Sequence, residues 1–271
     1  MDFVNTRYNR QELMPQLGPA AQYYLRRARV VSIGAGGVKS PMLYYLAAAG
    51  VGHLTIIDFD RVELSNLNRQ ILYTEADIGR NKTEAARERL HQLNSEITID
   101  AIDARVDADN IDDLLGGYEI VIEGGDALAG RLLCNNYCIR SRTPMVHASA
   151  QYGYGYVLTT LPGTTACFQC AFPDLPTGHG GSVPVFGVAT GIAGSLGAGE
   201  VIKLITGSGE PVTDGYLTFS VFSGRHEFIP VTLPVRPVET QRRRRLGQAR
   251  SRPTQARREA DEHRALWVLS R

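Results

Sequence analysis

Cysteine is scarce in this chain: its 271 residues include four, and none follows Cys170. They form two short-spaced pairs, Cys134 with Cys138 and Cys167 with Cys170. The sequence does not open with an apolar stretch preceded by basic residues, so a secretory signal is not expected. This spacing and the missing signal argue against a disulfide framework. We expect a cytoplasmic protein with reduced thiols.

Long hydrophobic runs are also rare. The run that could suggest a membrane span covers residues 185–205 and is rich in glycine, alanine and isoleucine. It contains Glu200, Lys203 and five glycines, which is typical of a closely packed helix in a protein core. We therefore expect a buried helix here and no contact with a membrane.

Neither sign of charge dominates, because the formal net charge is +1. The distribution is uneven, however: residues 240–271 contain ten arginines against three acids, which leaves residues 1–239 at about −6. A block of this kind usually stays solvated. We expect a basic, flexible tail at 240–271. The alternative is that the tail docks to an acidic partner or to nucleic acid. Of these two partners, we do not expect nucleic acid.

The sequence does contain a nucleotide-binding pattern. An apolar strand at 30–33 leads into a glycine turn at 34–37 (GAGG), and after an apolar helix a second strand ends at Asp58. A tight glycine turn lets backbone N–H groups and the positive end of a helix approach a phosphate. Asp58 lies 21 residues after Gly37, near the spacing of a ribose ligand. Because Lys39 replaces the third glycine of a dinucleotide turn, a plain tight turn is the alternative.

A polar segment at 65–70 (SNLNRQ) favours ATP over a nicotinamide cofactor. It follows the second strand, at the sheet edge where open α/β sheets bind ligands. Hydride transfer develops no charge on phosphate, whereas phosphoryl and nucleotidyl transfer do, and arginine is a planar, bidentate phosphate donor. Arg69 lies in this segment, and Lys82 adds a cation at the start of the next helix. A solvated loop with a surface lysine is the alternative.

Asp126 is the candidate magnesium ligand. It follows an apolar strand at 119–122 and two glycines, so it too is expected at the carboxyl edge of the sheet. Magnesium prefers one or two carboxylates together with phosphate oxygens and water. Capping of the helix that begins near Ala127 is an alternative role, and the two roles are compatible.

In order and spacing, these residues resemble the bacterial adenylating enzymes of the ubiquitin-activating superfamily. This branch includes molybdopterin-synthase and thiamine-pathway adenylyltransferases (ThiF-, MoeB- and HesA-like) and the microcin-type MccB peptide adenylases. The resemblance covers roughly residues 5–230. It rests on the segments 7–11, 34–37, 58–60, 65–70, Gly79 with Lys82, Gly125-Asp126 with Arg131, 167–170 and 194–203.

The resemblance implies an ATP-dependent adenylyltransferase that activates a carboxylate as an acyl-adenylate and releases pyrophosphate. Gly37 would face the phosphates, Asp58 the ribose, and Asp126 would carry Mg²⁺. The implied catalytic residues are Arg10, Asn66, Arg69, Lys82 and Asp126, with Arg10 reaching the ATP of the other subunit in a homodimer. The residues implied to bind ATP and Mg²⁺ are Gly34, Gly36, Gly37, Asp58, Asp60, Ser65, Asn66, Arg69, Gln70, Lys82 and Asp126.

Two departures from the family pattern bear on metal content and mechanism. Family members often hold zinc with two Cys-x-x-Cys pairs, but here the half-site Cys167 and Cys170 stands alone, so zinc is not expected. A four-sulfur site would need the other pair to converge on it, and a mixed site with His179 is a further alternative. Residues 178–184, where thioester-forming relatives carry a cysteine, contain none. We therefore expect no covalent cysteine intermediate.

The sequence leaves the substrate and two rival functions open. The carboxylate could be the C-terminus of a ubiquitin-like sulfur-carrier protein, the C-terminus of a peptide, or a small acid. A nicotinamide-dependent Rossmann oxidoreductase would explain the glycine turn and Asp58 but not the cations. A catalytically degenerate scaffold is suggested by Lys39, Ala127 and the missing cysteines.

The pattern predicts an α/β fold: a Rossmann-like, doubly wound sheet, mostly parallel, with a C-terminal antiparallel extension. We expect an adenylation domain at 1–239, opened by a helical arm at 1–29, and then the tail at 240–271. Strands are expected at 30–33, 53–57, 97–101, 119–122 and 145–150, and antiparallel strands within 152–161 and 216–231. Helices are expected at 82–94, at 131–140 and from 189.

Overall fold

The computed structural model describes residues 7–125, 127–174 and 183–231. The chain divides into two units, residues 1–233 and 234–271, and every described residue belongs to the first. The predicted tail at 240–271 and its boundary at residue 239 lie outside the described residues.

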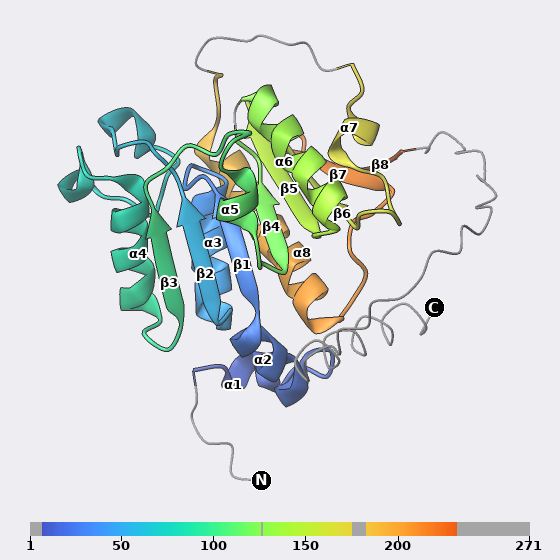
Figure 1. The fold of residues 1–271 in the computed structure, drawn as a ribbon, viewed down its shortest axis with the longest axis horizontal. Coiled ribbons are helices and arrows are strands. Elements are labelled where there is room, and N and C mark those ends of the chain that lie inside the picture. Colours follow the sequence, from blue (N-terminus) through green and yellow to red (C-terminus); the bar gives the residue numbers. More distant parts are fainter. Residues whose placement is uncertain (1–6, 126, 175–182, 232–271) are drawn as a thin grey trace, which may run out of the picture. The chain divides into compact units, whose positions relative to one another are not determined.

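One eight-stranded sheet carries the fold (Figure 1). Its strands are β1 (Arg29–Ile33), β2 (His53–Ile57), β3 (Thr98–Ile102), β4 (Ile120–Glu123), β5 (Met145–Gln151), β6 (Tyr154–Thr160), β7 (Gly215–Ser220) and β8 (His226–Pro230). The order is β3-β2-β1-β4-β5-β6-β7-β8. The neighbouring strands β3, β2, β1, β4 and β5 pair in parallel, whereas β6, β7 and β8 each pair antiparallel with the strand before them. This confirms the predicted mostly parallel sheet with its antiparallel extension.

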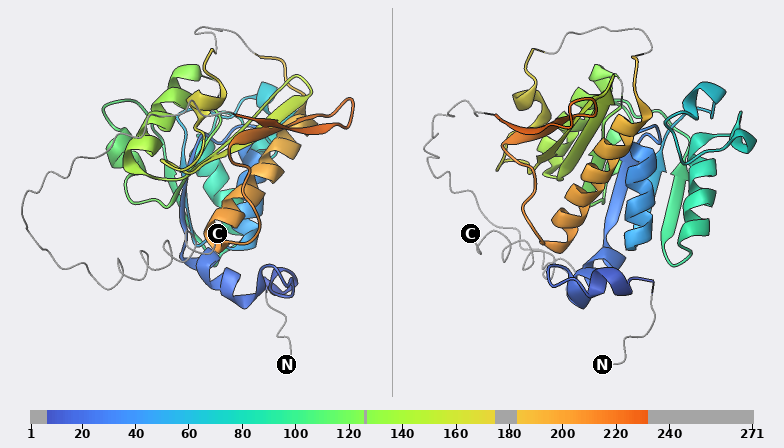
Figure 2. Two further views of the ribbon diagram at one scale, coloured as in Figure 1. Left: turned by 90° about the vertical axis from the view of Figure 1, so that its right-hand side faces the viewer. Right: turned by 180° about the vertical axis from the view of Figure 1, so that it is seen from behind.

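Helices cover both faces of the sheet (Figure 2). On one face lie α3 (Lys39–Ala49), α4 (Lys82–Leu93) and α8 (Gly187–Thr206), and on the other lie α5 (Ile111–Leu115), α6 (Leu128–Ser141) and α7 (Phe168–Ala171). Neighbouring strand residues supply the two cores: Val30 packs with the first set and Val31 with the second. Because both faces are covered, the central strands are mostly apolar instead of alternating regularly with polar residues.

The N-terminal arm, which was predicted to be helical, contains two helices, α1 (Asn9–Glu12) and α2 (Gly18–Arg27). Several short elements elsewhere were not predicted. The prediction missed α5, α7 and the 3-10 turns η1 (Leu64–Asn66) and η2 (Glu75–Asp77). These missed elements span five residues or fewer, too few to show a helical repeat of apolar residues.

Among the described residues, α8 alone is long and apolar enough to cross a membrane by length and composition. In the structure it packs against α3 and β5, as the sequence predicted for a core helix. The packing depends on glycine: a Cβ on Gly194 would lie 2.2 Å from the carbonyl oxygen of Val38, at the start of α3. Since Val38 directly follows the glycine turn, this contact fixes the end of α3 that faces the carboxyl edge of the sheet.

Gly194→Ala is expected to lower the free energy of unfolding by about 1–3 kcal/mol, because the added methyl group must push α8 away from α3. Gly191→Ala is the matched control on the same helix, where nothing lies within 4 Å of the added atom. It should be neutral or stabilising by up to about 1 kcal/mol through helix propensity. Chemical denaturation measures both, and equal stability of the two variants would contradict the close contact.

Candidate functional site

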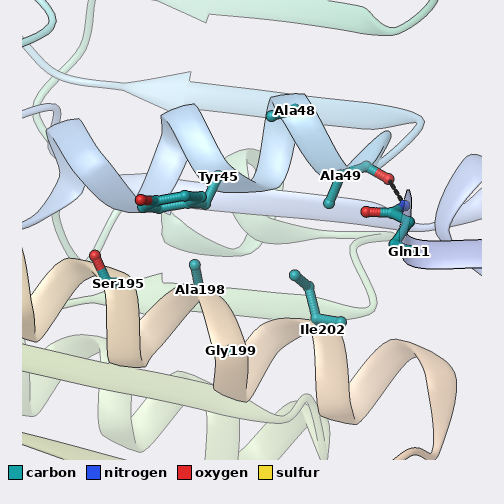
Figure 3. Close-up of a pocket in the computed structure, with 8 residues that line it drawn as sticks. All are labelled: Gln11, Tyr45, Ala48, Ala49, Ser195, Ala198, Gly199 and Ile202. Atoms are coloured by element: carbon teal, nitrogen blue, oxygen red, sulfur yellow. Dashed lines mark hydrogen bonds between the residues drawn. The ribbon is translucent and has the colours of Figure 1, made fainter. Parts of the chain in front are cut away.

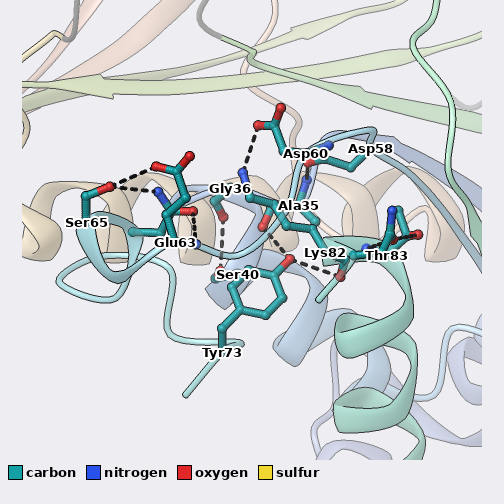
Figure 4. Close-up of polar contacts among 12 residues, drawn as sticks. Ala35, Gly36, Ser40, Asp58, Asp60, Glu63, Ser65, Tyr73, Lys82 and Thr83 are labelled. Carbon is teal, nitrogen blue, oxygen red and sulfur yellow. Dashed lines mark hydrogen bonds and ion pairs between the residues drawn. The ribbon is translucent and has the colours of Figure 1, made fainter. Parts of the chain in front are cut away.

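The glycine turn lies directly after β1, at the carboxyl edge of the sheet. Gly34 has a φ of 91°, which residues with side chains rarely adopt, and its N–H donates to the Ile57 carbonyl at 2.7 Å. From below, the Tyr73 hydroxyl donates to the Ala35 carbonyl at 2.9 Å (Figure 4). Strand β1 lies between β2 and β4, where the order of the strands reverses. Open α/β sheets bind ligands at such a point.

Asp58 holds the turn from the end of β2. One of its carboxylate oxygens accepts from the Ala35 N–H at 2.8 Å, and the other accepts from the Asp60 N–H at 2.9 Å (Figure 4). The residue is 9% exposed. The carboxylate therefore has a fixed position beside the turn, where an acid can bind the hydroxyls of a ribose.

The polar segment 65–70 lies over the turn. Asn66 forms a capping box with Glu63, whose N–H donates to the Asn66 side-chain oxygen at 3.2 Å. Arg69 donates to the Ser65 carbonyl at 2.9 Å and to the Asn68 side chain at 3.0 Å. A Cβ on Gly37 would lie 3.2 Å from Cγ of Arg69. These contacts hold a cation against the glycine turn.

Lys82 supplies a second, buried cation. It is 4% exposed, it opens α4, and its Nζ lies 2.8 Å from Oδ2 of Asp60. The N-terminus of a helix favours anions, so a lysine buried there needs a compensating negative charge. Asp60 provides it in this structure, and its side chain is half-exposed. A phosphate group could interact with the same ammonium.

Gln70 offers a buried acceptor to a ligand. It is 5% exposed, and its Oε1 has no hydrogen-bond partner within the described part of the chain. Its Nε2 lies 3.9 Å from the position that a Cβ on Gly36 would occupy. A buried acceptor without a donor destabilises the fold by about 1–3 kcal/mol, and a hydroxyl or amino group of a nucleotide would supply that donor. The residues present thus fit a nucleotide.

Ten of the predicted site residues are together at this edge: Gly34, Gly36, Gly37, Asp58, Asp60, Ser65, Asn66, Arg69, Gln70 and Lys82. Asp126 lies outside the described residues. Arg10 is exposed on α1, where the neighbouring Gln11 donates to the Ala49 carbonyl at 2.8 Å, at the end of α3. The glycine turn is at the other end of this 11-residue helix, about 16 Å away. Arg10 is therefore separated from the site of its own chain.

The described residues include no group of three His, Cys, Asp or Glu side chains that could hold a metal ion, and all four cysteines are free. Cys134 and Cys138 are buried on α6, and burial raises the pKa of both thiols, that of Cys138 to about 12. On α7, the Cys170 N–H donates to Sγ of Cys167 at 3.3 Å. The four sulfur atoms are thus not gathered into one group in this structure, and His179 of the alternative mixed site lies outside the described residues.

Four buried or partly buried polar residues at this edge were not predicted as site residues: Lys39, Glu123, His147 and Tyr156. Lys39 is 3% exposed, and a Cβ on Gly124 would lie 2.8 Å from its Nζ. Glu123 and His147 are fully buried, with Oε2 and Nδ1 2.8 Å apart. For Glu123, His147 and Tyr156, the signal in the sequence is an ionisable residue at the end of, or inside, a mostly apolar strand; Lys39 instead begins α3.

The charge of Glu123 is stabilised within the fold. Burial, the largest influence, raises the carboxyl pKa, but His147, Lys39 and the Gly125 N–H together lower it to about 2. Burial lowers the pKa of His147, so its imidazole is neutral at pH 7. Its Nε2 lies 2.9 Å from the Tyr156 hydroxyl, and its Nδ1 lies 2.8 Å from Oε2 of Glu123 without being aligned for a hydrogen bond. The buried carboxylate thus has a neutral imidazole on one side and the charge of Lys39 nearby.

Comparison with known proteins gives a consistent result. The ThiF family model matches residues 8–237, which include every strand of the sheet. The sulfur carrier protein adenylyltransferase of Thermus thermophilus is 38% identical over 224 residues, or 79% of this chain and 82% of that protein. The adenylyltransferase and sulfurtransferase MOCS3 of Culex quinquefasciatus is 38% identical over 220 residues, or 79% of this chain. The match spans 50% of MOCS3, which is longer.

Solved structures of E. coli MccB have the same fold. MccB with ATP superposes with a TM-score of 0.75 at 25% identity, covering 84% of this chain and 72% of MccB. The microcin C7 biosynthetic enzyme MccB in complex with N-formylated MccA gives a TM-score of 0.77 at 25% identity, with the same coverage of 84% and 72%.

Proposed function

Because this chain belongs to the ThiF family, we propose that it activates a substrate carboxylate with ATP, forming an acyl-adenylate and releasing pyrophosphate. The observation that carries the proposal is the pair of cations at the nucleotide turn. Arg69 lies against Gly37, and Lys82 is buried on Asp60. In a nicotinamide-dependent oxidoreductase neither cation would have a role in the reaction, because hydride transfer develops no charge on phosphate.

The enzyme class is that of the relatives, adenylyltransferases of the type that activates ubiquitin-like modifiers. In the proposed reaction, a carboxylate oxygen attacks the α-phosphorus of ATP. The bond from that phosphorus to the bridging oxygen breaks, and its electron pair leaves with pyrophosphate. Fixed cations stabilise the charge on the phosphate oxygens because they need no reorganisation during the reaction. We assign this task to Arg69 and Lys82, and no protein nucleophile is required.

The remaining nucleotide contacts follow from the positions described above. Backbone N–H groups of the turn and the N-terminal end of α3 would face the phosphates. Asp58 would bind the ribose, and Gln70 would accept from a nucleotide hydroxyl or amino group. We also propose Asp126 as the ligand of Mg²⁺, a hard cation that prefers carboxylate and phosphate oxygens. When bound, Mg²⁺ would neutralise part of the phosphate charge.

We propose that the acyl group passes to a nucleophile outside this chain, without a covalent cysteine intermediate. The thiolate is the nucleophilic form of cysteine. Burial raises the pKa of the Cys134, Cys138 and Cys167 thiols, which supports this proposal. The segment 178–184, which contains no cysteine, lies outside the described residues.

The substrate is proposed to be one of three kinds of carboxylate, activated in the cytoplasm. The Thermus relative is named for a sulfur carrier protein, which supports the C-terminus of a ubiquitin-like carrier. MccB was solved with N-formylated MccA, which supports the C-terminus of a peptide. A small acid remains the third possibility. The described residues do not distinguish the three, because the contacts above concern the nucleotide.

We propose a homodimer in which Arg10 serves the site of the other subunit, because it is far from its own. A groove of about 430 Å³ runs between α3 and α8 beside the N-terminal arm, lined by residues such as Tyr45, Ala198 and Ile202 (Figure 3). Tyr45 is 57% exposed in the single chain. A second copy placed over this face would bury apolar surface and bring a second arm toward the site.

ATP–pyrophosphate exchange with radiolabelled pyrophosphate tests the function. The assay compares a Gly-Gly-ended sulfur carrier, short peptides with free C-termini, and small carboxylic acids. We expect exchange that depends on one of these classes, because the acyl-adenylate forms reversibly. ATP binding without exchange for any class would argue against adenylation of these carboxylates. Absence of both exchange and ATP binding would favour the catalytically degenerate scaffold.

Arg69→Ala is expected to reduce exchange on the order of a hundred-fold or more, which corresponds to about 3 kcal/mol of lost transition-state stabilisation. Asp126→Ala should have a similar effect. Arg61→Ala is the matched control, because the side chain of this exposed arginine makes one hydrogen bond to the described residues, a long contact of 3.4 Å to the Gly79 carbonyl. Its exchange rate should stay within about two-fold of the unmodified chain. An unchanged rate in folded Arg69→Ala would refute the role of Arg69.

The trans role of Arg10 is tested with mixed subunits. Arg10→Ala and Arg69→Ala subunits are each expected to be nearly inactive alone. When mixed, a heterodimer has one site with both arginines intact, so up to about half of the activity per heterodimer should return. If verified heterodimers show no recovery, Arg10 does not act across the interface.

A further inference from the structure

Arg131 on α6 is an arginine at the carboxyl edge without an acid partner among the described residues. Its Nε donates to the Gly125 carbonyl at 2.5 Å. Its terminal nitrogens make longer contacts, 3.4 Å to the Tyr156 hydroxyl and 3.2 Å to the Ser149 hydroxyl. All three partners are neutral. The guanidinium therefore keeps its full positive charge, and it is only partly buried.

A series of polar contacts leads from this guanidinium into the fold. Arg131 donates to the Tyr156 oxygen, and the Tyr156 hydroxyl lies 2.9 Å from Nε2 of His147. Nδ1 of His147 lies 2.8 Å from Oε2 of Glu123, but the two atoms are not aligned for a hydrogen bond, and neither accepts or donates one within the described ranges. The series of contacts ends at the buried carboxylate of Glu123.

Both ends of this series of contacts, Glu123 and Arg131, bind the backbone of Gly125. Glu123 accepts from the Gly125 N–H at 2.8 Å, while Arg131 donates to the carbonyl of the same residue. Gly124 must also be glycine, since its φ is 150° and a Cβ would lie 2.0 Å from the Ala148 carbonyl oxygen. The turn after β4 and the guanidinium thus hold each other in place.

This arrangement lies next to the nucleotide turn. Strands β1 and β4 are parallel neighbours, with Ser32 opposite Ile122. The turn at Gly34 and the turn at Gly124 therefore leave the sheet side by side. On its other side, Arg131 contacts Ser149 on β5 and Tyr156 on β6, where the antiparallel extension begins. The guanidinium lies between the phosphate cations and this extension.

We infer that Arg131 binds the substrate carboxylate, and that Tyr156, His147 and Glu123 are its positioning residues; this inference rests on the proposed function. A planar guanidinium matches a carboxylate in a bidentate pair, and the Ser149 hydroxyl adds a third donor. The charge of Glu123 is already offset by Lys39, the other ionised group near it. Cys134 and Cys138, which also face Glu123 from α6, remain protonated because burial raises the pKa of their thiols.

Exchange kinetics measured separately for ATP and for the carboxylate test this inference. The probe is whichever of the three panel classes supports exchange by the unmodified chain. Arg131→Ala is expected to raise the KM for the carboxylate about 10- to 100-fold, since a hydrogen-bonded charge pair is lost, and to leave the KM for ATP within about two-fold. Arg131→Lys keeps the charge but not the fork, so it should recover part of the loss.

Tyr156→Phe tests the positioning residues. It keeps the ring packed on Phe172 and Tyr216 but removes the link to His147. We expect it to raise the carboxylate KM about 3- to 10-fold, again without an effect on ATP. The matched controls are Tyr118→Phe, whose hydroxyl contacts Thr55, and Arg140→Ala, which removes an exposed ion pair with Asp112. Both should leave the two KM values unchanged.

The outcomes separate the two proposals. No exchange by the unmodified chain with any panel class would overturn the proposed function. If the unmodified chain is active, an unchanged carboxylate KM in folded Arg131→Ala or Arg131→Lys would overturn this inference alone. Equal increases in both KM values would assign Arg131 to the structure of the turn and would also overturn it.

Discussion

The hydrogen bond between the Asp58 carboxylate and the Ala35 N–H is the contact on which the nucleotide site depends. It joins the end of β2 to the turn after β1, and the Tyr73 hydroxyl fixes the same residue through its carbonyl. Both backbone groups of Ala35 are therefore held before a ligand arrives. A reaction that is accelerated by positioning and by fixed charges needs such a turn, because any reorganisation would raise the barrier.

The two cations of the site are held in different ways. Lys82 is paired with an acid, and its charge is partly neutralised in the single chain. Arg69 is held by a carbonyl and an amide oxygen, both neutral, so its charge is free to act on a ligand. Arg131 resembles Arg69 in this respect. The edge of the sheet thus presents two arginines with uncompensated charge among the described residues, one beside the phosphate turn and one beside the turn after β4.

Local patterns were sufficient to predict which residues lie together around the glycine turn. The glycine turn, Asp58 and the segment 65–70 are each defined by residues close together in sequence, and the order of strands and helices follows from their apolar runs. The series of side-chain contacts that joins Glu123, His147 and Tyr156 was not predictable in this way. It depends on the pairing of β4 with β5 and of β5 with β6, and a one-residue shift of either strand would turn these side chains to the other face. Arg10 was placed by resemblance, since nothing in its local sequence indicates a ligand.

Lys39 was one of three sequence arguments for a catalytically degenerate protein, because it replaces a glycine in the nucleotide turn. The structure places its ammonium in the interior beside Gly124 and within electrostatic reach of Glu123. A buried lysine without an acid, or a buried glutamate without a cation, would destabilise the fold by several kcal/mol. The two residues therefore depend on each other, and the buried imidazole of His147 lies 2.8 Å from the same carboxylate. Because the charge of Lys39 is compensated by Glu123 inside the fold, the glycine turn stays intact. Lys39 therefore does not argue against an active site.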